Sequence, residues 1–485
     1  MEKGVFSDKI VDSLASGSMI RAMFEQGNKM KAEFGEENVY DFALGNPDPE
    51  PDAEIIDDMR SLASEPNIHK YMPNAGFPDV RARIAEKMTE ESGKPFTADH
   101  VIMVTGAAAG LSVTFHSLLN PGEKVIVLAP YFMEYNSYVG NQGGTVKVVK
   151  TVPGTFQPDP EAIAAAIDAG TKAIIINSPN NPSGAVYSEE VLTELAKAIE
   201  AAEKRIGHPV FVVSDEPYVK IVYDGVKVPS VAKIFKNSIT VNSFSKSLAL
   251  PGERIGYVAV SPDIDDAEML CSAIVYSNRT LGFVNAPSLM QKVCVRHLDR
   301  CVGYDAYKER RDMLYKILTD AGYECSLPQG AFYLFPKCPI EDDRKFAEMA
   351  LRHHMVVVAG SGFSYPGYFR LSYCVSKETI RNSAQAFKDL YEEAAGKMSH
   401  HVHINRGTCS SKVEFDLRDG KVYNTVFTGG CHGNLQGIPA LIEGRDAEDV
   451  IRRVKGIRCG FKSTSCPDQL AQALEEALAE EKNNA

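Results

Sequence analysis

The sequence predicts an α/β protein with a mostly parallel sheet, a smaller α+β domain and a separate C-terminal module. Short β-branched runs alternate with helical patterns through the first half of the chain. After about residue 290, long helical patterns surround one apolar run, and near residue 397 the composition changes again. Alternating strands and helices are typical of a parallel sheet that helices cover on both faces.

The composition favours a globular protein that handles small molecules. The chain has 485 residues, of which 44% are hydrophobic and 24% charged, enough for several domains. Its net charge of -12 disfavours nucleic acid as the partner of the main domain, because phosphate contacts need clustered basic residues. No stretch is typical of a membrane span or a signal peptide, so we expect no membrane partner and a cytoplasmic location.

The strands expected in the large domain are apolar and β-branched, and each is followed by turn residues. They are residues 123–130, 145–152, 172–179, 208–215, 238–245 and 254–261. Helical patterns over residues 159–170 and 188–205 lie between them. This alternation predicts a large domain over about residues 45–285.

A second domain is expected from the N-terminal segment together with about residues 290–397. Helical patterns cover residues 304–322 and 377–396, on either side of the apolar run "GAFYLFPK". Residues 398–485 are rich in Gly, Cys and Thr and hold four of the ten cysteines, so we expect them to form a third domain. The predicted boundary separates residues 1–397 from residues 398–485.

Three polar residues follow neighbouring expected strands. Asn181 comes after one strand, Asp215 ends the next, and Lys246 follows the third. Ligands of open parallel sheets bind outside the carboxyl ends of the strands, so these side chains are expected to meet in one crevice.

The surroundings of Lys246 indicate a specific cofactor. A single lysine is usually a solvated surface charge. Here Ser243 and Ser245 precede it and Arg254 follows, and hydroxyls with a guanidinium suggest a phosphate held near an amine. A lysine that forms a Schiff base beside a phosphate suggests pyridoxal 5'-phosphate (PLP).

Four ordered motifs then resemble a known family. They are "SPNNPSG" (178–184), "SDEPY" (214–218), "SFSKSLALPGERIG" (243–256) and "FRLSY" (369–373). Their spacing resembles the class I and II aminotransferases, the aspartate aminotransferase group of fold-type I PLP enzymes, over roughly residues 1–395. The resemblance implies the fold-type I architecture, PLP as cofactor and a homodimer with shared active sites.

The resemblance also implies catalytic roles. Lys246 is expected to carry PLP as the internal aldimine and then to move a proton at the substrate α-carbon. Asp215 is expected to pair with the protonated pyridine nitrogen, and Tyr218 and Asn181 to donate to the ring oxygen. Without the resemblance, Asp215 could be a cap or turn acid and Asn181 part of an ordinary Asn-Pro turn.

The phosphate site is expected at a strand, a glycine turn and a helix over residues 104–119. The cofactor contacts expected there and nearby are Gly106, Ala107, Ala108, Ser243, Ser245 and Arg254. Ala108 stands where the family usually has Ser or Thr, so one hydroxyl contact is missing.

Other site residues follow from the resemblance. Phe132 is expected to stack on the cofactor ring, although it could equally be a core residue. Tyr71 is expected to reach the phosphate of a neighbouring subunit. Arg370 and Gly45 are expected to bind the substrate α-carboxylate, unless Arg370 is a surface ion pair. Arg279 lies in the region where dicarboxylate-specific relatives place a second arginine.

The expected function is a ping-pong aminotransferase that acts on an amino acid and a 2-oxo acid. A PLP-dependent β-lyase or decarboxylase would share Lys246 and Asp215 and remains an alternative. A regulatory protein that senses PLP or a nucleotide is an alternative from another class. The complete set of catalytic residues argues against it.

The tail contains "TGGCHGN", "IRCG" and "TSCPDQL" and resembles the TSCPD domain. Its cysteines are Cys409, Cys431, Cys459 and Cys466, and His403 and His432 lie nearby in sequence. Thiolate and imidazole ligands could bind zinc or iron, but the tail has no C-x-x-C pair. A redox dithiol and buried structural thiols are the other interpretations, and the role of the tail stays open.

Overall fold

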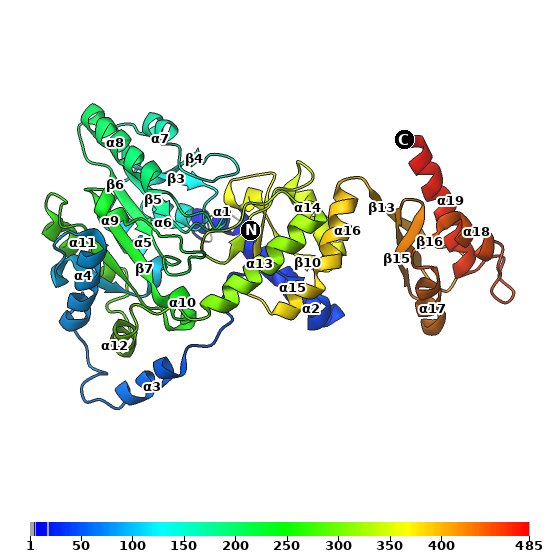
Figure 1. The fold of residues 1–485 in the computed structure, drawn as a ribbon, viewed down its shortest axis with the longest axis horizontal. Coiled ribbons are helices and arrows are strands. Elements are labelled where there is room, and N and C mark those ends of the chain that lie inside the picture. The colour runs from blue at the N-terminus through cyan, green and yellow to red at the C-terminus, as the bar shows by residue number, and fades with distance from the viewer. Residues whose placement is uncertain (1–3, 5, 17–18, 485) are drawn as a thin grey trace. The chain divides into compact units, whose positions relative to one another are not determined.

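A computed structural model describes residue 4, residues 6–16 and residues 19–484. The chain divides into two compact units, Met1–Ala384 and Gln385–Ala485. Figure 1 shows the elements of both units. No helix among the described residues is both long and apolar enough to cross a bilayer.

A seven-stranded sheet forms the centre of the first unit, in the order β2-β8-β7-β6-β5-β3-β4. Its strands are β2 (Val101–Val104), β3 (Lys124–Ala129), β4 (Thr145–Lys150), β5 (Thr171–Asn177), β6 (Phe211–Asp215), β7 (Ser238–Ser243) and β8 (Gly256–Val260). Strand β8 runs antiparallel to both of its neighbours, β2 and β7, and all other pairs in the sheet are parallel. The mostly parallel sheet is therefore confirmed.

Helices cover both faces of this sheet. They are α3 (Ala53–Leu62), α4 (Pro78–Ser92), α5 (Gly106–Leu118), α6 (Tyr135–Gly140), α7 (Pro160–Ala166), α8 (Glu189–Ile206), α9 (Val231–Ile234), α10 (Phe244–Ser247), α11 (Ala267–Thr280) and α12 (Ser288–Arg296). Val125 and Val127 of β3 pack in a core with α5 and α11, whereas Ile126 and Leu128 pack in a core with α7 and α8. Alternate residues of a strand face opposite sides, so one apolar strand supplies both cores.

A smaller layer completes the first unit. It contains α2 (Met19–Phe34), β1 (Tyr40–Asp41), α13 (Tyr304–Ala321), β9 (Tyr333–Leu334), α14 (Asp343–Arg352), β10 (Met355–Val356), β11 (Val358–Ala359), β12 (Phe369–Ser372) and α15 (Lys377–Asn382). The helix α1 (Asp8–Ser16) instead lies near α6, where Lys9 donates to the backbone oxygen of Gly140. β1 pairs with β10 in parallel, so the N-terminal segment joins residues more than 300 positions away. Strands β11, β12 and β9 form a separate antiparallel sheet.

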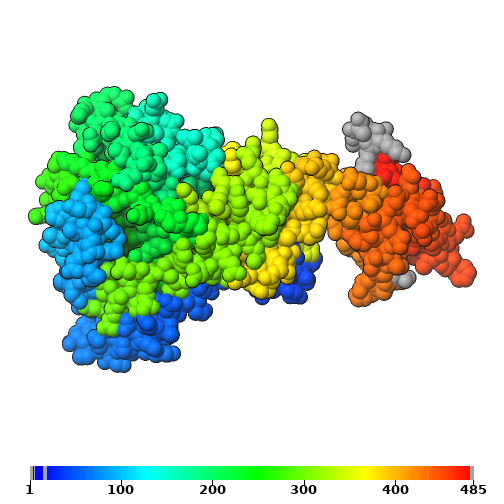
Figure 2. Space-filling model, viewed as in Figure 1, coloured from blue at the N-terminus to red at the C-terminus, as the bar shows by residue number. Residues whose placement is uncertain are grey.

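The second unit has its own sheet and core and is coloured orange to red in Figures 1 and 2. Its elements are α16 (Ala384–Ala394), β13 (Met398–Ile404), β14 (Lys412–Arg418), β15 (Lys421–Thr428), α17 (His432–Ile442), β16 (Arg445–Asp446), α18 (Ala447–Val454) and α19 (Cys466–Asn484). The four strands form an antiparallel meander. Phe415 of β14 packs in one core with Val450 of α18 and Leu470 and Leu474 of α19.

Candidate active site

A cavity of about 360 Å³ lies at the carboxyl edge of the central sheet. Asn181 follows β5, Asp215 ends β6 and Lys246 lies in the short helix after β7, so three strand ends meet at this cavity. Twelve of the residues expected in the site line it: Gly45, Ala107, Ala108, Phe132, Asn181, Asp215, Tyr218, Ser243, Ser245, Lys246, Arg254 and Arg370. The structure therefore brings residues separated by up to 325 positions into one space.

Lys246 is held inside this cavity with an amine that loses its proton readily. Its Nζ donates to the backbone oxygen of Gly45 at 2.8 Å. Burial, with smaller contributions from the charges of Arg370 and Arg254, lowers the pKa of the Lys246 amine to about 8. Near neutral pH an appreciable fraction of the amine is uncharged, and only the uncharged form is a nucleophile.

Asp215 presents an unused acceptor. The hydroxyl of Tyr135 donates to its Oδ2 at 2.6 Å, and the Asn177 amide donates to its backbone oxygen. Oδ1 is buried and has no hydrogen-bond partner among the residues that the structure describes. Burial raises the pKa of this carboxyl to about 6, although the Tyr135 hydrogen bond opposes the shift. A cationic N–H donor at Oδ1 would satisfy the oxygen and favour the ionised carboxylate.

Arg370 is buried at the other side of the cavity. Its guanidinium lies between the rings of Tyr333 and Phe363, at 4.7 and 4.8 Å from their centres. One nitrogen donates to Asn181 Oδ1 at 3.1 Å and another to the backbone oxygen of Ala43. Its Nε has no partner among the described residues. Arg370 is only 2% exposed, so the alternative of a surface ion pair is wrong.

Gly45 leaves room for Tyr333, a site residue that no sequence motif indicated. A Cβ atom at residue 45 would lie 2.0 Å from the hydroxyl of Tyr333, which shows that no side chain fits there. The Tyr333 hydroxyl also lies 3.0 Å from that of Tyr218. Tyr333 belongs to the apolar run at residues 330–337, where nothing in the sequence distinguishes a site residue from a core residue.

The expected phosphate site combines a helix N-terminus with hydroxyls and one arginine. α5 begins at Gly106, whose φ of +82° favours glycine. A Cβ at this residue would lie 2.9 Å from a terminal nitrogen of Arg254. The hydroxyl of Ser243 donates to that of Ser245 at 2.8 Å. Backbone N–H groups at the start of α5 and the Arg254 charge fit a bound phosphate, and Ala108 offers no hydroxyl there.

Three other expected residues, Gly106, Tyr71 and Arg279, are not among those that line the cavity. Tyr71 is 92% exposed. Arg279 is also exposed, and its guanidinium lies over the ring of Tyr276 at 5.5 Å. Other residues line the cavity that the sequence did not indicate as site residues. They include Tyr135, Tyr138, Asn177, Glu134 and Tyr333. Their sequence signals were weak because aromatic and amide residues are common beside strand ends.

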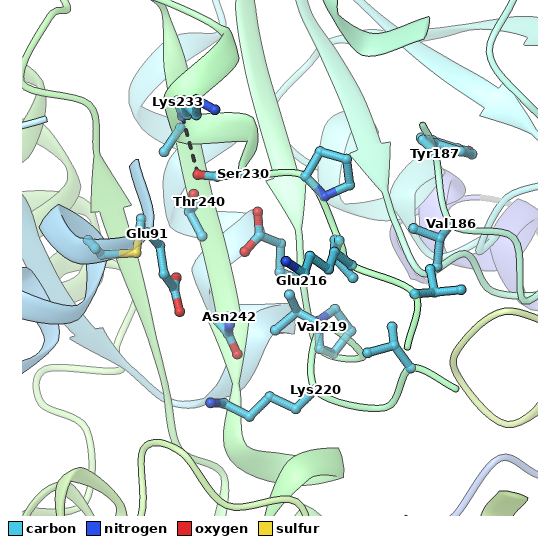
Figure 3. Close-up of a pocket in the computed structure, with 18 of the residues that line it drawn as sticks. Glu91, Val186, Tyr187, Glu216, Val219, Lys220, Ser230, Lys233, Thr240 and Asn242 are labelled. Atoms are coloured by element: carbon cyan, nitrogen blue, oxygen red, sulfur yellow. Dashed lines mark hydrogen bonds between the residues drawn. The ribbon is translucent and has the colours of Figure 1, made fainter. Parts of the chain in front are cut away.

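A larger cavity of about 740 Å³ lies on the opposite face of the same sheet (Figure 3). Glu216 and Asn242 line it, whereas their neighbours Asp215 and Ser243 line the first cavity. Consecutive residues of an extended strand face opposite sides, which explains this division. Burial raises the pKa of the Glu216 carboxyl to about 7 and lowers the pKa of the Lys220 amine.

The fold and the first cavity together define the aspartate aminotransferase architecture. Residues 37–387 match the family model "Aminotransferase class I and II", and residues 390–478 match the TSCPD domain. The chain therefore belongs to the class I and II aminotransferases and carries a C-terminal TSCPD domain. The sequence-based predictions of family, fold class and enzyme class are confirmed.

Individual relatives support this assignment. The chain is 36% identical over 325 residues to an aspartate/prephenate aminotransferase of Thermus thermophilus, covering 66% of this chain and 82% of the relative. It is 31% identical over 377 residues to an aspartate aminotransferase of Bacillus subtilis, covering 73% and 92%.

Solved structures agree with the sequence matches. An aminotransferase from Eubacterium rectale superposes with a TM-score of 0.78 at 42% identity, covering 81% of this chain and all of that chain. The aspartate aminotransferase of Thermus thermophilus with maleate superposes with a TM-score of 0.70 at 30% identity, covering 77% and 97%.

Proposed function

We propose that this chain is a PLP-dependent aminotransferase that transfers an amino group between an amino acid and a 2-oxo acid in two half-reactions. The observation that carries the proposal is the buried, unpartnered Oδ1 of Asp215 in the cavity that also holds the Lys246 amine. A carboxylate with an open acceptor fits a protonated pyridine nitrogen, and an amine of lowered pKa fits a reactive aldehyde.

The residues present divide into those that would hold the cofactor and those that would bind substrate. The start of α5, Ser243, Ser245 and Arg254 would bind the phosphate, and Phe132 would cover one face of the ring. Asp215 and Tyr218 would bind polar atoms of the ring. When bound, PLP supplies the electron sink that stabilises negative charge at the substrate α-carbon.

The catalytic steps assigned to the chain's own residues are binding and proton transfer. Arg370 binds the substrate α-carboxylate through its guanidinium, for which its buried Nε has a free N–H. Lys246 Nζ would hold the cofactor and would move the proton at the substrate α-carbon. The proposed substrates are amino acids, which Arg370 would bind through the α-carboxylate. This agrees with relatives that are named as aspartate or aspartate/prephenate aminotransferases.

A homodimer and a cytoplasmic location complete the proposal. By the family resemblance, Tyr71 would contact the phosphate bound by the partner subunit, and its 92% exposure is consistent with such a contact. All ten cysteines are free thiols in the structure, which suits a reducing compartment. Light scattering of the purified protein would test the assembly, and a monomer would contradict it.

The visible absorption spectrum of the purified protein tests the proposed activity. We expect a cofactor band that converts to the pyridoxamine form when particular amino acids are added, and that returns with a 2-oxo acid. The Lys246→Ala variant provides the control. Absence of any band after PLP is supplied would contradict cofactor binding. Release of pyruvate and ammonia without an acceptor would instead indicate the β-lyase reaction.

A further inference from the structure

The second unit contains a row of three cysteine sulfurs that the proposed aminotransferase reaction does not use. Cys409 Sγ lies 3.6 Å from Cys466 Sγ and 3.9 Å from Cys431 Sγ. These residues come from three separate segments: the loop before β14, the start of α17 and the start of α19. Folding of this unit thus brings together sulfurs that are 22 and 57 positions apart in the chain.

The backbone is shaped to bring Cys431 to Cys409. The two glycines before Cys431, Gly429 and Gly430, have φ angles of +75° and +100°. A Cβ at residue 430 would lie 3.3 Å from Cys409 Sγ and 3.2 Å from the backbone nitrogen of Ser410. The sequence "TGGC" is therefore required for the close approach of these two thiols.

The buried end of the row receives a dedicated hydrogen bond. The hydroxyl of Ser410 donates to Cys466 Sγ at 3.0 Å, and the amide of Asn405 donates to the Ser410 oxygen at 2.7 Å. Ser410 is 3% exposed and Cys466 is 7% exposed. These hydrogen bonds fix the position of the Cys466 sulfur beside Cys409.

Cys409 differs from the buried cysteines of the first unit. Cys294 lies in an apolar core, where burial raises the pKa of its thiol well above the usual range. Cys409 is exposed, and hydrogen bonds from Cys466 and then Cys431 lower the pKa of its thiol. Reactive cysteines are accessible and have stabilised thiolates, whereas buried apolar cysteines are inert.

The arrangement favours thiol chemistry over metal binding. Among the residues that the structure describes, no group of three or more His, Cys, Asp or Glu side chains could hold a metal ion. The sulfurs instead form a chain with Cys409 in the middle, in contact with one buried and one exposed partner. A thiolate between two thiols can form a disulfide with either.

We propose that Cys409, Cys431 and Cys466 form a thiol–disulfide exchange centre, in which Cys409 pairs alternately with Cys466 and Cys431. The substrate class is a low-molecular-weight disulfide or a protein dithiol. The proposal does not depend on the aminotransferase reaction, because none of these residues belongs to the first unit.

The exchange is balanced as follows. The Cys409 thiolate attacks an external disulfide RSSR, forms a mixed disulfide and releases RS⁻. Cys466 loses its proton to solvent and attacks Cys409 Sγ, which forms the Cys409–Cys466 disulfide and releases a second RS⁻. The two thiols lose two electrons and two protons in total, and RSSR becomes two RSH. Attack by Cys431 on Cys409 Sγ then moves the bond to the exposed pair and regenerates the Cys466 thiolate.

Peptide mapping of the full-length protein tests the proposal. The reduced chain is equilibrated with oxidised and reduced glutathione, its free thiols are blocked with iodoacetamide, and it is digested with trypsin. Cleavage after Lys and Arg places Cys409, Cys431, Cys459 and Cys466 in four separate peptides, so each disulfide gives a distinct mass. We expect both a 409–466 and a 409–431 linked pair.

Single substitutions distinguish the central sulfur from its partners. Cys409→Ser should abolish both linked pairs and slow reaction with glutathione disulfide about tenfold or more. Cys466→Ser should keep the 409–431 pair, and Cys325→Ser, in the first unit, should change neither. Separate glutathione adducts without linked pairs would overturn the proposal. Stoichiometric zinc that protects the thiols from the blocking reagent would also overturn it.

Discussion

Asp215 and Glu216 are adjacent in the chain but face two different cavities. Their surroundings show which features distinguish a carboxyl in the candidate active site from a buried carboxyl elsewhere. Burial raises the pKa of both carboxyls, to about 6 and about 7. Asp215 has an unpartnered oxygen in a cavity shared with Lys246, Arg254 and Arg370. Glu216 accepts a hydrogen bond from Ser214 at 2.7 Å, in a cavity of about twice the volume.

The comparison teaches that neither cavity size nor a shifted pKa identifies the reaction site in this protein. Both carboxyls are desolvated, because each lies beside an apolar core of the same sheet. Only the smaller cavity combines an open acceptor, a reactive amine and a guanidinium with a free N–H. The site is defined by several complementary groups around one space, and a single residue with a shifted pKa is not sufficient.

The largest expected effect comes from Lys246, one of two compared lysines whose pKa values burial lowers. Lys246→Ala should reduce kcat at least about 10³-fold, because it removes both the cofactor attachment and the proton carrier. Lys220→Ala, in the larger cavity, is the matched control and should keep kcat within about threefold. Steady-state transamination assays measure both. Full activity of the Lys246 variant would refute the assigned mechanism.

The next largest effect on kcat/KM is expected from Asp215, with its neighbour Glu216 as the comparison. Asp215→Asn should lower kcat/KM about 10²-fold or more, because a neutral amide does not stabilise a protonated ring nitrogen. Glu216→Gln should change kcat/KM less than about threefold. A similar loss in both variants would mean that the second cavity takes part in the reaction.

Gly45 tests the substrate side of the smaller cavity. Gly45→Ala should push Tyr333 away from Tyr218 and disturb Arg370, lowering kcat/KM about 10- to 100-fold, equivalent to about 1–3 kcal/mol. The matched control is Gly252→Ala, since nothing lies within 4 Å of a Cβ at residue 252. An unchanged kcat/KM in the Gly45 variant would show that the tyrosine moves without consequence.

Substitution of Glu216 should change the free energy of unfolding and leave activity nearly unchanged. A carboxyl whose folded-state pKa is raised contributes stability below its unfolded value, near 4.5, and loses it as the pH rises through about 7. Glu216→Gln should therefore gain on the order of 2 kcal/mol relative to the natural chain between pH 5 and pH 8. Thermal unfolding at both pH values measures the difference. Exposed Glu190→Gln, in the same cavity lining, should show no such pH dependence.

The smallest effect is expected from removal of the tail. A chain without residues 398–485 should keep the cofactor band, because every lining residue of the smaller cavity lies before residue 371. The compact units divide earlier, after Ala384, so a second truncation there tests which end point gives the better-folded enzyme. Loss of the band in both truncations would contradict the view that the tail is a separate module.

Much of the fold could be predicted from the sequence because its information is local. All six expected strands of the large domain are present, as β3 to β8, since β-branched runs with turn residues after them favour strands in any context. The helix expected over residues 377–396 is divided at Ser383 into α15 and α16. That serine is buried and its hydroxyl donates to the backbone oxygen of Ile380, a contact that periodicity does not reveal.

The sequence by itself determined the family, the succession of strands and helices along the chain and the residue types needed for PLP chemistry, because motif spacing and strand periodicity are properties of the chain. Only the tertiary structure decided that Tyr333 closes on Gly45, that Tyr135 donates to Asp215 and that three tail sulfurs form a row. These contacts join residues 22 to 288 positions apart, and such distances depend on how complete elements pack.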